Sequence, residues 1–236
     1  MRESYQEFLK RISVFEKQNL DLGKNYFKGP TSLAYKIDKE NRIKSFFGDT
    51  VVFELDEEIK DKINEIFSKI YDQASECFSE RLKPNTMHMT LHDLSNSPEQ
   101  SAVDAEMEEN LKEIQSIVTL VKNDTIKMRT NFIFNMVNTS LVIGLVPSDE
   151  NEFNKLMDIY YLVDNIKPAK YHLTPHITLS YYNINGFSVE SKNKLEEVVS
   201  NLNDDNFEIT LCTEKLFYQR FYSMNDYHNI LKLTNE

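Results

Sequence analysis

The sequence predicts an α+β fold of two pseudo-symmetric lobes that face each other across a central cleft, with helices on the outside. Two short strings share one design, at residues 87–91 (MHMTL) and 175–179 (PHITL), each with a His-x-Thr between apolar residues. Both strings alternate as a β-strand does, because residues two apart along a strand share a face. The order strand, helix, His-x-Thr strand, helix, strand occurs twice along the chain, which suggests a duplicated architecture.

Length and composition indicate a packed globular protein. The 236 residues can form one large domain or two small lobes, and 40% of them are hydrophobic. The two cysteines, Cys77 and Cys212, lack the spacing of a metal site and make no disulfide framework, which indicates a reducing cytoplasm. The polar N-terminus is unlike a signal peptide, and the longest apolar stretch is too short to cross a bilayer. We therefore expect a cytoplasmic protein without a membrane partner.

The net charge limits the possible partners. A net charge of −11 disfavours binding to a long nucleic acid duplex, which needs a broad basic face. A small nucleotide or an RNA end remains compatible, because a local pocket can be positive on an acidic protein. The oligomeric state does not follow from the sequence.

Hydrophobic periodicity assigns the elements of the first half. Residues 1–44 form an N-terminal helical extension, with a helix at 3–20 and a loop at 21–43. The core then begins with a strand at 50–55 and a helix at 57–80. The first motif strand covers 86–92, a helix runs from a Ser-Pro-Glu-Gln start at 97–100 to about 122, and a strand follows at 126–136.

The second half repeats this order. A strand is expected at 139–146, a helix begins at Pro147 and ends before Pro168, and the second motif strand covers 175–182. A helix at 188–202 and strands at 206–212 and 215–223 complete the series. The core therefore spans 45–223, with one lobe at about 45–136 and the other at about 137–223, and residues 224–236 are a C-terminal tail.

The two motif strands suit acid–base chemistry at a phosphodiester. His88 and His176 can divide the work, since an imidazole is both base and acid near neutral pH. One would take a proton from the attacking oxygen and the other would give a proton to the leaving oxygen. Thr90 and Thr178 lie on the same strand faces and can donate to the phosphate oxygens. The sequence lacks a spacing typical of metal ligands, so we expect neither a metal nor another cofactor.

These residues resemble the 2H phosphoesterase superfamily, which includes LigT-like RNA 2′,5′-ligases and cyclic phosphodiesterases. The family pattern is apolar-His-apolar-Thr/Ser-apolar, and both strings fit it, with Pro175 in the first slot of the second. The resemblance covers about 45–223. It implies two pseudo-symmetric lobes, antiparallel sheets lining a groove, and phosphodiester chemistry without a metal.

Four further residues are candidates for substrate binding. His92 continues the face of His88, while Ser180 and Tyr182 continue the face of His176, where a tyrosine can stack on a base. Arg129 is a candidate phosphate contact. Each also has a plainer interpretation, as a polar residue at a strand end or a solvated surface charge.

The same alternation places two other side chains away from the cleft. Asp93 is expected on the opposite face of the first motif strand. Tyr181 is expected to face the core.

The leading hypothesis is a metal-independent phosphodiesterase that acts on a 2′,3′-cyclic phosphate or on a 2′,5′ or 3′,5′ linkage of a small nucleotide or RNA end. An RNA 2′,5′-ligase uses the same histidine pair and is an alternative. A nucleotide-binding or sequestering module without turnover is a second alternative, and a structural protein with chance motifs is a third. The sequence leaves open which histidine is the acid.

Overall fold

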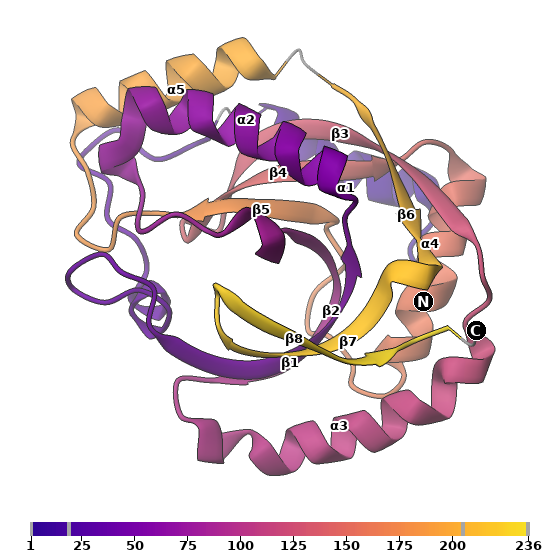
Figure 1. The fold of residues 1–236 in the computed structure, drawn as a ribbon. Coiled ribbons are helices and arrows are strands. Elements are labelled where there is room, and N and C mark those ends of the chain that lie inside the picture. The colour runs from indigo at the N-terminus through magenta and orange to yellow at the C-terminus, as the bar shows by residue number, and fades with distance from the viewer. Residues whose placement is uncertain (1, 18–19, 204–205, 235–236) are drawn as a thin grey trace.

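In the part of the chain that the structure describes, a curled antiparallel sheet of eight strands forms the body of the protein, and five α-helices lie around it (Figure 1). The computed structural model describes residues 2–17, 20–203 and 206–234. The elements in chain order are α1 (Tyr5–Lys17), β1 (Ser45–Glu54), α2 (Glu57–Ala74), β2 (His88–Ser97), α3 (Asp104–Ile117), β3 (Thr125–Met136), β4 (Ser140–Pro147), α4 (Glu150–Asp164), β5 (His176–Tyr181), α5 (Val189–Leu202), β6 (Glu208–Cys212), β7 (Leu216–Ser223) and β8 (Asp226–Lys232). The α+β prediction is confirmed. None of the helices in these ranges has the length and apolar character needed to span a lipid bilayer.

The two motif strands are neighbours in the middle of the sheet. The strand order is β6-β3-β4-β5-β2-β1-β7-β8, and β2 pairs with β5 in antiparallel fashion at Met89 and Ile177. Four strands lie on each side of this junction. The two halves of the fold are therefore the halves of one continuous sheet, each containing one His-x-Thr strand.

The halves of the sheet are interleaved along the chain, unlike the contiguous division at residue 136. The strand β3, expected in the first lobe, pairs with β4 and β6 in the second half of the sheet. The strand β7 returns to the first half and pairs with β1. Residues 226–232 of the expected tail form the edge strand β8 on β7. Element order along the chain cannot reveal such exchanges, because strand partners depend on where each connection returns to the sheet.

Helix boundaries also differ from the periodicity. The Ser-Pro-Glu-Gln start at 97–100 does not begin the α-helix, because β2 extends to Ser97 and α3 begins at Asp104. In the N-terminal extension, α1 is described to Lys17, and residues 18–19 of the expected helix lie outside the described residues. Residue 1, residues 204–205 and residues 235–236 of the expected tail lie outside them as well.

The N-terminal extension packs against the rest of the chain. Phe8 of α1 is buried, and its ring centroid lies 5.1 Å from that of Phe153 in α4. Arg11 of α1 donates hydrogen bonds to the Leu173 carbonyl at 2.8 Å and to Thr174 Oγ1 at 2.9 Å. These contacts hold the segment that leads into β5, and with it the start of the second motif.

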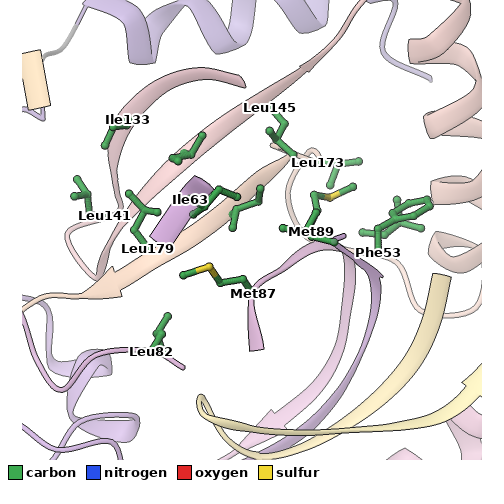
Figure 2. Packing of buried hydrophobic residues seen from close by; sticks show 14 of the residues in the cluster. Phe53, Ile63, Leu82, Met87, Met89, Ile133, Leu141, Leu145, Leu173 and Leu179 are labelled. Atoms are coloured by element: carbon green, nitrogen blue, oxygen red, sulfur yellow. The ribbon is translucent and has the colours of Figure 1, made fainter. Parts of the chain in front are cut away.

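The apolar residues of both motifs lie in the core, as their alternation predicts. Met87, Met89 and Leu91 of the first motif are at most 3% exposed. Ile177 and Leu179 of the second are fully buried. Figure 2 shows Met87, Met89 and Leu179 among the packed side chains of this cluster. Burial of one face fixes the register of each strand, because a slip by one residue would expose the apolar set.

A buried carboxylate holds β2 to its neighbours. The Asp49 side chain of β1 is fully buried and accepts hydrogen bonds from Ser95 N at 2.8 Å, Asn110 Nδ2 at 2.9 Å and Tyr218 OH at 2.8 Å. The pairing of β1 with β2 shifts by one residue between Asp49 and Thr50, so the amide of Ser95 is satisfied by this carboxylate. Asp49 thereby ties β1, β2, β7 and α3 together behind the first motif.

Replacing Asp49 by alanine is expected to destabilise the protein by about 3 kcal/mol, because three buried donors lose their acceptor. Tyr218→Phe removes only one of these donors and should cost about 1 kcal/mol. Urea unfolding curves of the two variants measure the difference. Equal and small effects for both variants would show that the carboxylate is not the centre of this network.

Candidate functional site

Both motif histidines line one cleft on the concave side of the sheet. The cleft has a volume of about 570 Å³, and His88, Thr90, His176 and Thr178 all contribute to its wall. The charge on His176 lowers the pKa of His88, so the two imidazoles are within electrostatic reach of each other. The sequence hypothesis that the rings lie far apart, as in a structural protein with chance motifs, is not consistent with this arrangement.

The two imidazoles are oriented by the same local interaction. His88 Nδ1 lies 2.8 Å from the carbonyl oxygen of Thr86, and His176 Nδ1 lies 2.7 Å from that of Thr174. A carbonyl only accepts hydrogen bonds, so each Nδ1 carries a proton and donates it. In the neutral ring Nε2 then keeps its lone pair. Each histidine therefore has a fixed tautomer with Nε2 left for a bound molecule.

Burial favours the neutral form of both histidines. It lowers the pKa of His88 to about 4, while the Thr86 carbonyl and the Asp93 carboxylate act in the opposite direction. Burial also lowers the pKa of His176 below its ordinary value, assisted by the charge of Lys36 and opposed by the Thr174 carbonyl and Asp93. A bound phosphate anion would favour the charged form of a nearby imidazole.

Two matching β-bulges change the alternation just after each motif. Val51 and Val52 of β1 pair with His92 and Thr90, so Leu91 is the extra residue of β2. Leu141 and Val142 of β4 pair with Ser180 and Thr178, so Leu179 is the extra residue of β5. A bulge of this kind moves the following residues to the other face of the strand.

The bulges overturn three predictions of side-chain direction. Asp93 lines the cleft, although strict alternation places it on the opposite face. Tyr181 also lines the cleft, but it is 8% exposed and belongs to the hydrophobic core, where alternation places it. Ser180 and Tyr182 are fully buried, so neither is available to a substrate. Tyr182 packs instead on aromatic rings of the core, namely those of Phe27, Phe78 and Phe187.

His92 is held within the structure. Its Nδ1 lies 2.7 Å from the Asp93 carbonyl, and its Nε2 lies 3.1 Å from Asp164 Oδ1 at the end of α4. The side chain is 1% exposed, and both ring nitrogens are engaged. His92 is part of the wall of the cleft, but it offers no free nitrogen to a ligand, so the plainer structural interpretation fits it.

Arg129 does not reach the cleft. Its side chain is exposed on β3, where the residue pairs with Val146 and Glu208. Arg129 is not among the described residues that line the cleft, so the structure gives no support for a phosphate contact there. Its strand, β3, lies in the outer part of the second half of the sheet, away from the central pair β2 and β5.

Lys36 is a cleft residue that the sequence did not single out. It is the only lysine or arginine among the described residues that line the cleft. Its Nζ lies 3.4 Å from the Tyr181 hydroxyl and above the rings of Tyr181 and Phe46, at 5.1 and 5.3 Å from their centroids. No motif marks Lys36, because it comes from the N-terminal extension, outside the region with the duplicated order.

Asp93 forms the other charged part of the wall. Its Oδ2 accepts a hydrogen bond from the Tyr171 hydroxyl at 2.9 Å, which connects β2 to the loop before β5. The bulge at Leu91 accounts for the direction of the Asp93 side chain. This bulge is seen only in the pairing of β1 with β2 and has no mark in the sequence. Within the described residues, no group of three or more His, Cys, Asp or Glu side chains is arranged to hold a metal ion.

Comparison with solved structures supports the fold. No family model and no curated protein sequence matches the chain. The protein ATU0111 of Agrobacterium tumefaciens, described as a conserved protein of unknown function, is similar over 87% of this chain and 94% of its own length, with 15% identity and a TM-score of 0.66. At this identity the likeness shows a shared fold, which does not by itself carry function.

Two further similar structures have lower TM-scores. TT0787 of Thermus thermophilus matches 78% of this chain and 95% of its own length, with 14% identity and a TM-score of 0.49. Escherichia coli LigT, in a complex with 3′-AMP, matches 79% of this chain and 96% of its own length, with 12% identity and a TM-score of 0.49. A LigT protein is thus among the structural neighbours of the chain.

The buried imidazoles are expected to titrate on the acid side of an ordinary histidine. In an NMR titration of the free protein, the ring signals of His88 should shift with a midpoint near pH 4, and those of His176 below 6.5. The pKa values fall because burial penalises the charged ring. His88→Gln and His176→Gln assign the two signals. A midpoint at or above 6.5 for either ring would contradict the described environment.

Proposed function

We propose that the protein is a metal-independent phosphodiesterase that uses His88 and His176 as general acid and general base. Its substrate would be a 2′,3′-cyclic phosphate or a 2′,5′ or 3′,5′ linkage in a small nucleotide or RNA end. The observation that carries the proposal is the matched pair of imidazoles in one cleft, each with Nδ1 bound to the carbonyl two residues earlier.

The matched pair suits a reaction in which two protons move at once. The Nε2 of one neutral imidazole takes a proton from the attacking water or hydroxyl, whose oxygen forms a new bond to phosphorus. The other imidazole, in its charged form, gives the Nε2 proton to the leaving oxygen as the old phosphorus–oxygen bond breaks. The hydroxyls of Thr90 and Thr178 donate to the non-bridging oxygens and stabilise their negative charge. After one turnover the two rings have exchanged protonation states.

A nucleotide-binding module without turnover would not require two basic imidazole nitrogens in its cleft. Binding of a phosphate requires hydrogen-bond donors, whereas the matched tautomers give each ring a basic Nε2 that a purely binding site does not use. The volume of about 570 Å³ suits a ligand of nucleotide size. The net charge of −11 further favours a short substrate over a long nucleic acid.

Loss of either imidazole is expected to lower turnover by about 100-fold or more, the typical contribution of a positioned acid or base. The variants are His88→Ala and His176→Ala, and His228→Ala is the matched control, since His228 is exposed on β8 and is not among the described residues that line the cleft. A panel of nucleoside 2′,3′-cyclic phosphates, 2′,5′-oligoadenylate, cyclic dinucleotides and RNA with a cyclic end, read by mass, supplies the substrate. Full activity of either cleft variant would contradict the shared mechanism. Tight binding of panel members by the wild type without any product would identify a sequestering module.

The pH dependence of kcat/KM should be bell-shaped, with its maximum on the acid side of pH 6.5. The base must be unprotonated and the acid protonated, so the maximum lies between the two pKa values of the free enzyme, which are both lowered. Initial rates across the pH range, with circular dichroism at each pH to confirm folding, measure the profile. A maximum above neutral pH would show that His88 and His176 are not the acid and base that limit kcat/KM.

Chelation is expected to leave turnover unchanged, because acid, base and phosphate donors all come from side chains. Activity after dialysis against EDTA is compared with untreated enzyme, and each divalent ion is then added back. Loss with EDTA and recovery with one ion would replace the proposal by a metal-dependent hydrolysis.

A further inference from the structure

The cleft carries two opposite charges besides the histidines, the Asp93 carboxylate on β2 and the ammonium of Lys36, which contacts Tyr181 of β5. Asp93 comes five residues after His88, and Tyr181, the hydrogen-bond partner of Lys36, comes five residues after His176. The strands β2 and β5 are antiparallel and are paired next to the histidines, at Met89 and Ile177. Residues that follow the two motifs therefore extend in opposite directions from the centre. The carboxylate and the ammonium mark two different ends of the cleft.

The ammonium of Lys36 has no negative partner among the described residues. Its one hydrogen bond there is to the Tyr181 hydroxyl at 3.4 Å, and that hydroxyl donates its own proton to Met224 Sδ at 3.0 Å. The Lys36 side chain is half-buried. A half-buried lysine that faces a cleft and has no carboxylate partner is suited to an anionic ligand, since an unpaired charge away from water is costly.

The backbone fixes Lys36 in this position. Leu33 and Ile37, on either side of it, are each 1% exposed in the core. The Lys36 amide donates to the Leu33 carbonyl at 3.0 Å, and the Lys36 carbonyl accepts from the Lys44 amide at 2.9 Å. The lysine is therefore carried by an ordered segment, so that its charge is preorganised before a ligand arrives.

We propose that Lys36 and Tyr181 form a subsite for a second anionic group, so that the preferred substrate is a nucleotide with a terminal phosphate in addition to the phosphodiester between the histidines. This inference rests on the proposed function for the place of the scissile group. The phosphodiester occupies the centre, where the two histidines and threonines meet. The terminal phosphate lies at the Lys36 end, because Asp93 repels an anion at the other end. The charges of Lys36 and Asp93 thus orient the substrate in a single direction along the cleft.

The test compares two nucleotides that differ only in the second anion, adenosine 2′,3′-cyclic phosphate with and without a 5′-phosphate. The wild type should show a KM roughly tenfold lower for the 5′-phosphorylated form, as a charge-assisted hydrogen bond would give. Lys36→Met keeps the length and packing of the side chain and should bring the ratio of the two KM values close to one. Lys36→Arg should restore the preference. Lys112→Met, on the exposed surface of α3, is the matched control and should keep the ratio of the wild type.

A binding experiment separates this inference from the proposed function. The same two nucleotides are titrated calorimetrically into His88→Ala and into the double variant His88→Ala/Lys36→Met. A preference for the 5′-phosphorylated form that disappears in the double variant supports the subsite, even if the wild type cleaves neither nucleotide. The inference is overturned if the wild type has no preference, if the preference survives Lys36→Met, or if Lys36→Met weakens both nucleotides equally, which would place the lysine at the scissile phosphate.

Discussion

The antiparallel pairing of β2 with β5 is the constraint on which the candidate site depends. It makes two strands that are far apart in sequence neighbours at the centre of the sheet, with the histidine of each beside the junction at Met89 and Ile177. The apolar residues of both strands then anchor the convex side, and the register leaves both imidazoles on the concave side. If either strand slipped by one residue, its histidine would enter the core and its buried apolar residues would enter the cleft.

Much of this centre could be predicted from the sequence, because it is local and periodic. The alternation around His88 and His176 correctly assigns the buried and cleft-facing residues as far as Thr90 and Thr178. The prediction fails beyond Leu91 and Leu179, because the bulges at these two residues depend on how β1 and β4 pair with the motif strands. No spacing within a single strand encodes that pairing. Tyr182 therefore lies in the core, although alternation places it in the cleft.

The larger differences have the same origin in long-range structure. Element order along the chain indicates a duplication, but the returns of β7 and β3 to opposite halves of the sheet are not visible in it. Lys36 could not be found for a related reason. It enters the cleft from a segment with no periodic pattern, and only its packing between Leu33 and Ile37 brings it to Tyr181.

The carbonyl contacts of the two histidines have a consequence for how freely this chain can change. Residues 86 and 174 are both threonines, yet each serves its imidazole through the main chain, which every amino acid possesses. No acidic side chain has to be kept beside either ring to set its tautomer, in contrast to arrangements in which a carboxylate does that work. The orientation of each ring thus depends on the backbone conformation just before its strand, and the side chains at positions 86 and 174 can differ without changing it.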